Sequence, residues 1–222
     1  MKNIKAILKK IRLKINKIGA KRRNKKFKIK DFSIISNNCF AGIVYQHFNI
    51  EYNTPTIGLY FFPKEYIKFV AKFSYYMNAK LEFIDARYSK YYDVLCKRNQ
   101  EKAIIGILDD VEIVFLHYKT KEEAFEKWER RKKRLSKNII FKFNDQNGAE
   151  YEDISRFDKL PSENKICFTA KKYNELPCTI QIKKYKKYNE IKEDYYSFYK
   201  YMNFYDFVYN CFGRKINEKK EK

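Results

Sequence analysis

Short apolar runs alternate with helix-like segments along most of this 222-residue chain, and this alternation constrains its fold more than any other feature. Apolar runs bounded by polar residues are typical of strands, whereas apolar spacings of three and four are typical of helices. We expect strands at residues 32–36, 56–62, 81–85, 103–108, 111–118, 139–143, 165–169 and 178–184. We expect helices at residues 39–48, 63–77, 121–135, 149–159 and 206–212.

Three local signals support these boundaries. Asp109-Asp110 separates two apolar runs, which predicts a tight hairpin. Pro63 stands where helices favour proline, and Thr120 with Glu123 has the spacing of a capping box. Strands that alternate with helices, together with one hairpin, predict a single α/β domain with three α/β/α layers and a mixed β-sheet over residues 31–212.

The first thirty residues form a basic arm that differs from the rest of the chain. They contain fourteen lysines or arginines and no acidic residue, whereas the whole chain carries a net charge of +22. The isoleucines and Leu8 between residues 4 and 18 fall three or four apart, as on one face of a helix. A basic amphipathic helix of this kind lies at the surface of anionic membranes. Residues 213–222 form a charged tail that we expect to be disordered.

The cysteine pattern and the hydropathy predict a cytoplasmic protein. The five cysteines are odd in number and include no Cys-x-x-Cys pair, so they are expected to be reduced thiols. No apolar run approaches the ~18 residues of a membrane-spanning helix. The N-terminus lacks the apolar core and cleavage site of a secretory signal. We therefore expect a cytoplasmic protein that associates with the inner membrane face through residues 1–30.

Polar side chains follow several of the predicted strands. In open α/β sheets, sites form at the carboxyl ends of the strands. This rule selects Asn37, Asn38, His117, Asn144, Asp145, Lys171 and Lys172. The rule predicts only where a site lies, because such loops are polar in most α/β proteins.

The candidate functional residues, including Cys39 and the Asp109-Asp110 turn, also have structural interpretations, which for most of them are the stronger ones. Asn37 and Asn38 could hold an anion at a helix N-terminus, although capping of the helix by Asn38 is favoured. Cys39 could be a nucleophile at that terminus, or a small buried residue. His117 could be a general base, or a histidine bonded to its surroundings. The carboxylates of Asp109-Asp110 are better explained by the turn than by metal binding.

A basic stretch at residues 128–134 contains Arg130, whose guanidinium suits a phosphate group, or which belongs to a solvated helix face. The chain contains no Walker loop, no Gly-x-Gly-x-x-Gly and no zinc signature. We therefore assign no metal ligand, and the cofactor remains unknown.

Six motifs, in order, are similar to a bacterial family of unknown function whose members are often labelled exopolysaccharide biosynthesis proteins. They are residues 36–42 (SNNCFAG), 51–63 (EYNTPTIGLYFFP), 106–118 (GILDDVEIVFLHY), 127–134 (KWERRKKR), 141–148 (FKFNDQNG) and 165–171 (KICFTAK). The resemblance covers roughly residues 31–212. It implies a three-layer α/β/α fold and a role in surface-polysaccharide production, but it transfers no catalytic residue.

Our leading interpretation is a protein of surface-polysaccharide assembly at the cytoplasmic membrane face. If it is an enzyme, we expect a glycosyl or acyl transferase acting on a lipid-linked sugar or with a nucleotide sugar. His117 would be the general base and Asp145 its partner. Substrate-binding residues would be Asn37, Asn38, Asn144, Arg130 and Lys171.

Two alternatives belong to other functional classes. One is a non-catalytic scaffold that binds the polysaccharide machinery through surface aromatic residues. The other is a nucleic-acid binder that uses the arm and the helix at residues 130–134, and it ranks last. A nucleic-acid binder would more often spread its cations along one face of the fold.

Overall fold

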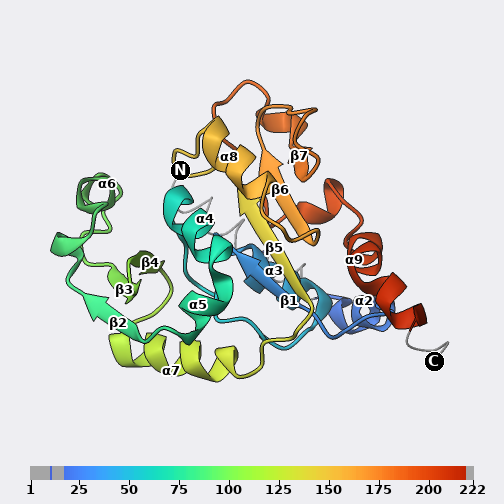
Figure 1. Cartoon of the computed structure of the whole chain (residues 1–222), viewed down its shortest axis with the longest axis horizontal. Helices are drawn as coiled ribbons and strands as arrows, with labels where there is room; N and C mark the ends of the chain where they lie inside the picture. The colour runs from blue at the N-terminus through green and yellow to red at the C-terminus, as the bar shows by residue number, and fades with distance from the viewer. Residues whose placement is uncertain (1–10, 12–17, 219–222) are drawn as a thin grey trace.

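A parallel sheet with the strand order β1-β5-β6-β7 lies at the centre of the molecule (Figure 1). The computed structural model of the chain describes Ile11 and residues 18–218. The parallel strands are β1 (Ser33–Ser36), β5 (Ile139–Asn144), β6 (Lys165–Thr169) and β7 (Thr179–Gln181). A separate antiparallel sheet, β2-β3-β4, contains β2 (Leu81–Ile84), β3 (Ile104–Leu108) and β4 (Val111–Phe115).

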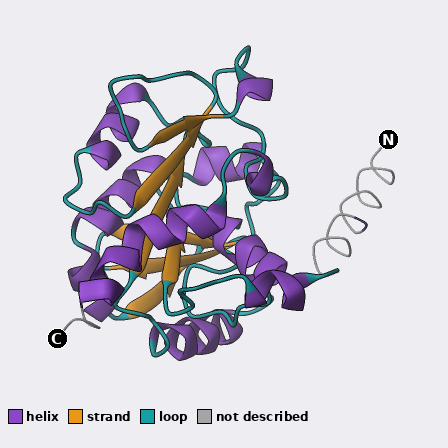
Figure 2. Ribbon diagram, turned by 90° about the vertical axis from the view of Figure 1, so that its right-hand side faces the viewer, coloured by secondary structure: helices purple, strands orange, loops and turns teal. Residues whose placement is uncertain are grey.

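Helices cover both faces of the parallel sheet (Figure 2). They are α2 (Ala20–Lys25), α3 (Phe40–Phe48), α4 (Pro63–Ala71), α5 (Phe73–Asn78), α6 (Tyr92–Lys97), α7 (Lys121–Lys132), α8 (Tyr151–Asp158) and α9 (Phe204–Glu218). Short 3₁₀ turns are η1 (Ala86–Tyr88), η2 (Lys183–Tyr185) and η3 (Phe198–Lys200). The predicted α/β class, with helices on both sides of a sheet, is confirmed.

Neighbouring residues of the parallel strands supply two separate cores. Ile34 and Ile140 pack with α3 and α9 on one face. Ile35 and Phe141, one position further along each strand, pack with α4 and α8 on the other. Side chains alternate across a strand, so a sheet buried on both faces needs nearly continuous apolar runs. This explains why the short run of residues 32–36 forms a central strand.

The strands divide between two sheets, whereas the sequence predicted one mixed sheet. In Figure 1, α4 and α5 lie between the parallel sheet and the antiparallel strands. The core on that side accordingly contains Leu108 and Ile113 of the hairpin as well as Phe143 of β5. The Asp109-Asp110 hairpin itself is confirmed, and Asp109 adopts the left-handed conformation that such turns require.

The predicted strand at residues 56–62 is wrong, because this segment is a buried connection between the two sheets. Tyr60 exchanges two backbone hydrogen bonds of 2.9 Å with Val114, and Phe61 donates one of 3.0 Å to Asn37. Gly58 has a φ of +74°, which bends the run out of the extended region. Its apolar residues therefore signal burial in this case, without a strand.

Several boundaries also differ from the prediction. The long helix expected at residues 63–77 breaks at Lys72 into α4 and α5. Phe27 and Ile29, which we assigned to the arm, are each 6% exposed and pack in the core with Ile34. The helix α9 extends past residue 212, where we expected the tail to begin, as far as Glu218. The amphipathic helix predicted around residues 4–18 lies almost entirely outside the described residues, as do residues 219–222.

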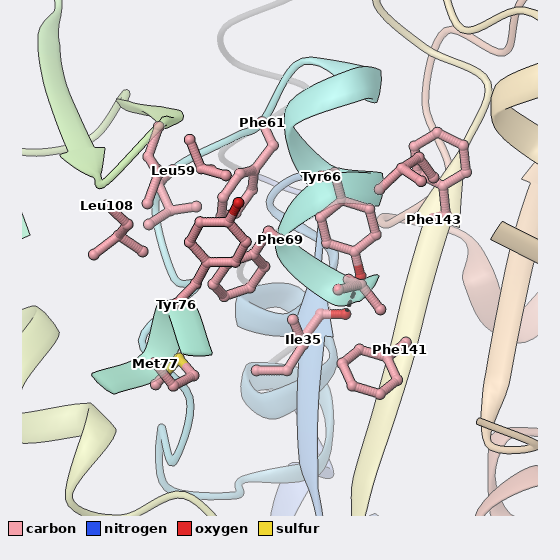
Figure 3. Packing of buried hydrophobic residues seen from close by; sticks show 14 of the residues in the cluster. Ile35, Leu59, Phe61, Tyr66, Phe69, Tyr76, Met77, Leu108, Phe141 and Phe143 are labelled. Atoms are coloured by element: carbon pink, nitrogen blue, oxygen red, sulfur yellow. Dashed lines mark hydrogen bonds between the residues drawn. The ribbon is translucent and has the colours of Figure 1, made fainter. Parts of the chain in front are cut away.

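Tyr66 joins the parallel sheet to the helices above it (Figure 3). Its hydroxyl donates a hydrogen bond of 2.7 Å to the carbonyl of Ile35, and its ring stacks on Phe143 at a centroid distance of 5.6 Å. The side chain is completely buried, so burial raises the pKa of its hydroxyl. A single tyrosine thus satisfies a buried polar group while it fills the core.

Two glycines allow a matched test of this packing. In Gly106→Ala, the new Cβ would lie 2.5 Å from the Phe115 ring and 2.9 Å from Leu81, so we expect a loss of about 1–3 kcal/mol. In Gly42→Ala the nearest atom, on Ile57, is 3.6 Å away, and α3 should gain up to about 1 kcal/mol. Urea unfolding of both variants measures this difference. Equal stabilities would contradict the packing between β3 and β4.

Candidate functional site

A buried polar cluster lies at the carboxyl ends of β1 and β5, centred on Lys142. Lys142 lies within β5 and has no solvent-exposed surface. Its Nζ forms an ion pair with Asp194, which is equally buried. It also donates hydrogen bonds of 3.2 Å to Oδ1 of Asn37 and 3.0 Å to Oδ1 of Asn38. The ammonium group therefore joins both strand ends to a segment some fifty positions later in the chain.

Amide side chains complete this cluster. Asn37 donates to Oδ1 of Asn144 at 2.8 Å, and Asn144 donates to Oδ2 of Asp194 at 2.7 Å. Asn38 donates to the other oxygen of Asp194 at 3.1 Å. Oδ1 of Asn38 also accepts a 3.0 Å bond from the backbone of Phe40, the first residue of α3, although the N-cap residue itself is Cys39 and not Asn38 as predicted.

The electrostatics of the cluster depend on two opposing effects. Burial lowers the pKa of the Lys142 ammonium, while the neighbouring Asp194 carboxylate opposes that change. Removing one member of a buried ion pair typically costs about 3–5 kcal/mol, because the other charge remains without compensation. The rings of Phe40 and Phe168, 5.2 and 6.0 Å from Nζ, add cation–π contacts.

Asp145, the residue after Asn144, holds two loops together. Its carboxylate accepts backbone hydrogen bonds from Ala170 at 2.6 Å and from Ile191 at 2.9 Å. Burial raises its pKa to about 6, although the two backbone donors act in the opposite direction. Asp145 thus connects β5 to the segments that follow β6 and η2.

A pocket of about 360 Å³ lies beside the polar cluster. Its lining comes from α3 and its N-cap, from the buried connection at residues 52–58, from the loop after β4 and from the late segment that carries Asp194. The lining residues are Cys39, Gly42, Ile43, Gln46, Tyr52, Ile57, Gly58, His117, Tyr195 and Tyr196. Two of them follow cluster residues directly in the chain, since Cys39 follows Asn38 and Tyr195 follows Asp194.

A buried arginine stands behind one wall of this pocket. Arg131 of α7 is 8% exposed and donates hydrogen bonds of 2.7 Å to the Tyr118 hydroxyl and 3.4 Å to the carbonyl of Ile57. Its guanidinium lies 5.3 Å from the centre of the Tyr52 ring. Among the described residues, no carboxylate forms an ion pair with it. Its positive charge therefore favours an anionic group in the pocket.

The predicted site residues fall into three groups. His117 lines the pocket, and Asn37, Asn38 and Asn144 meet in the buried cluster. Asp145 lies next to that cluster in sequence and is bonded to backbone amides. Arg130 and Lys171 are exposed, Arg130 paired with Glu126 at 3.0 Å and Lys171 donating to the carbonyl of Lys186. The structure does not bring these two side chains to the pocket.

Sequence reasoning missed Lys142, Asp194 and Arg131. The position of Lys142 gave one usable signal, since a lysine within the apolar run IIFKF needs a buried partner if that run is a central strand. Asp194 gave no such signal, because it lies in a polar, irregular stretch. Arg131 is adjacent to the predicted Arg130, and only the helical register decides which of the two faces inward.

A family model described as "Domain of unknown function (DUF1919)" matches residues 9–212. The chain belongs to the DUF1919 family. An uncharacterized protein of Haemophilus influenzae is 31% identical over 160 residues, which cover 72% of this chain and 71% of that protein. The DUF1919 match includes both sheets, the polar cluster and the whole pocket.

Two further observations concern the described part of this DUF1919 chain. Over these residues, every helix is too short or too polar to cross a bilayer. Within the same residues, no three histidine, cysteine or acidic side chains are grouped so that they could hold a metal ion.

The raised pKa of Asp145 predicts a measurable dependence of stability on pH. The folded protein binds this proton more tightly than the unfolded chain, so the contribution of Asp145 to stability falls as the pH rises from about 4 to about 6. The unfolding free energy of the wild type, relative to Asp145→Asn, should fall by up to about 3 kcal/mol between pH 4 and pH 7.

Urea unfolding of both proteins at several pH values measures this difference. The comparison with the variant is necessary because burial lowers the pKa of His47 to about 4, which gives an opposite slope in the same range. His47 is present in both proteins, so its contribution cancels. A difference that does not change with pH would show that Asp145 is ionised throughout.

Proposed function

We propose that this chain is a transferase of surface-polysaccharide assembly that moves an acyl group onto a sugar hydroxyl. The observation that carries the proposal is that Cys39 and His117 line the same pocket. A thiol and an imidazole on one cavity supply the nucleophile and the general base that covalent acyl transfer requires. Cys39 is partly exposed and is the N-cap residue of α3, where the helix dipole favours a thiolate.

The proposed reaction has two steps. In the first, His117 takes the thiol proton, the Cys39 sulfur attacks the carbonyl carbon of an activated acyl donor, and the donor's leaving group departs with that proton. In the second, His117 takes the proton of the sugar hydroxyl, whose oxygen attacks the thioester carbon. Cys39 then leaves as thiolate and recovers the proton from His117.

The lining of the pocket suits a sugar. A volume of about 360 Å³ lies in the lower part of the range for small-molecule sites. Tyr52, Tyr195 and Tyr196 combine an apolar ring face with a polar hydroxyl, and Gln46 adds an amide. These groups can contact both the C–H face and the hydroxyls of one pyranose ring.

Association with an anionic membrane surface completes the proposal. Residues 1–30 contain fourteen lysines or arginines, and their isoleucine spacing predicts an interfacial helix. Polysaccharides built on lipid carriers are assembled at such surfaces, so this association would keep the pocket near its acceptor.

Substitution of the two reactive residues tests the chemistry. With p-nitrophenyl acetate as donor, the wild type should release nitrophenolate and gain one acetyl group on the peptide that contains Cys39. Cys39→Ser should abolish this acetylation, and His117→Gln should slow it about 10²-fold or more near pH 7. The matched control is Cys96→Ser, since Cys96 is exposed on α6 and does not line the pocket.

The outcomes separate the possible mechanisms. Loss of acetylation in Cys39→Ser but not in His117→Gln would support the covalent step and exclude His117 as its base. In cells that carry these variants, loss of polymer acylation in His117→Gln but not in Cys39→Ser would indicate direct transfer. Normal polymer in both variants would refute the proposed active site.

Vesicle co-sedimentation of the full chain tests the membrane proposal. Replacing Lys2, Lys5, Lys9 and Lys10 by glutamine should weaken binding to vesicles with anionic lipid, at about 1 kcal/mol per charge. The control replaces the exposed Lys119, Lys121, Lys171 and Lys172 and so makes the same change in net charge. Truncation at residue 30 is unsuitable, because Phe27 and Ile29 belong to the core. Equal binding of the two variants would rule out a specific role for the arm.

A further inference from the structure

Residues 190–196 form an irregular segment that is fastened along its length to the end of β5, and we call this segment the strap. Glu190 accepts a hydrogen bond from the backbone of Gly148 at 3.2 Å. The backbone of Ile191 donates to Asp145, and the carbonyl of Lys192 accepts from Gln146 at 3.0 Å.

Asp194 provides the buried attachment of the strap. It is the only strap residue in the Lys142 cluster among the described contacts, with both of its oxygens bonded to Asn38 and Asn144 and an ion pair to Lys142. Ile191, completely buried in the core beneath α3, adds an apolar attachment. An irregular segment needs such side-chain bonds, because a strand ladder does not hold its backbone.

The two residues after Asp194 face a different environment. Tyr195 and Tyr196 line the pocket together with residues of α3, and burial raises the pKa of the Tyr195 hydroxyl. The Cα atoms of Tyr195 and Tyr196 lie only one and two trans peptide units from that of Asp194, so the backbone that carries these rings stays close to the buried carboxylate. The position of this tyrosine wall is therefore tied to the buried ion pair.

We propose that Lys142 and Asp194 are positioning residues, which hold the strap so that Tyr195 and Tyr196 form the acceptor-facing wall of the pocket. The placement of the strap is independent of the catalytic chemistry, whereas the term "acceptor-facing" rests on the proposed function. The arrangement explains why a costly buried ion pair occurs directly behind a pocket. Nearly all of the polar groups in the cluster are engaged with one another, so its role is to hold the strap in position.

Hydrogen exchange and cysteine alkylation of Asp194→Asn in the full chain test the proposal. We expect amide exchange of residues 190–196 to accelerate at least tenfold, while β5 and β6 keep their protection. We also expect iodoacetamide to modify Cys39 at least threefold faster relative to Cys96, which is remote from the pocket. Cys96 is already exposed and reports the intrinsic alkylation rate, while the retained protection of β5 and β6 separates local opening from general destabilisation.

Two further variants complete the design. Asp109→Asn makes the same chemical change at an exposed turn with positive φ, which asparagine tolerates, and should behave as the wild type. Gln146→Ala removes the bond to Lys192 and the two bonds that Oε1 of Gln146 accepts from Asn38 and Asn144, but it leaves the buried ion pair in place. It should accelerate exchange of the same amides to a smaller extent. It decides the question if Asp194→Asn does not fold.

Unchanged exchange of residues 190–196 and an unchanged Cys39 to Cys96 ratio, in a folded variant, would overturn the proposal. These readouts do not require transferase activity. Failure of the acyl-transfer experiments would therefore leave the positioning role standing, and failure of this experiment would leave the chemistry of Cys39 and His117 untouched.

Discussion

The buried charge of Lys142 is the constraint on which the arrangement around the pocket depends. A lysine inside a parallel sheet that is covered on both faces cannot reach water, so the protein must supply a carboxylate and oxygen acceptors around its ammonium group. Asp194 supplies the carboxylate, and Asn37 and Asn38 supply the acceptors. In meeting this requirement, the chain brings the ends of β1 and β5 and the strap to one place.

The same requirement separates two kinds of polar residue. The cluster side chains are buried and bonded to each other, so they fix structure. His117 and Cys39, which lie on the neighbouring pocket, are accessible and belong to residue types that carry out acid–base and nucleophilic chemistry. The buried Arg131, which contacts the pocket-lining Ile57 and Tyr52, adds positive charge. The pocket therefore combines reactive groups with walls that are held from behind.

The sequence predicted the elements well and the interactions between them poorly. Apolar runs identified the hairpin and most strands, and the Thr120 cap identified the start of α7, because these features depend on neighbouring residues. The run at residues 56–62 misled us, since burial without a ladder leaves the same apolar pattern. The rule for carboxyl ends found Asn37, Asn38 and Asn144. It could not find Asp194, which lies 50 residues beyond Asn144 and has no pattern of its own.

The parallel pairing of β1 with β5 also has a consequence for the order in which the molecule is made. Lys142 and Asn37 are 105 positions apart, and the whole antiparallel sheet lies between them. On a ribosome, the hairpin of β3 and β4 can form from adjacent residues while β1 still has no strand to pair with. During that interval Ile34 and Ile35 are exposed, and only the synthesis of β5 gives them a sheet to join. The nascent chain thus carries an unpaired apolar edge for almost half of its elongation.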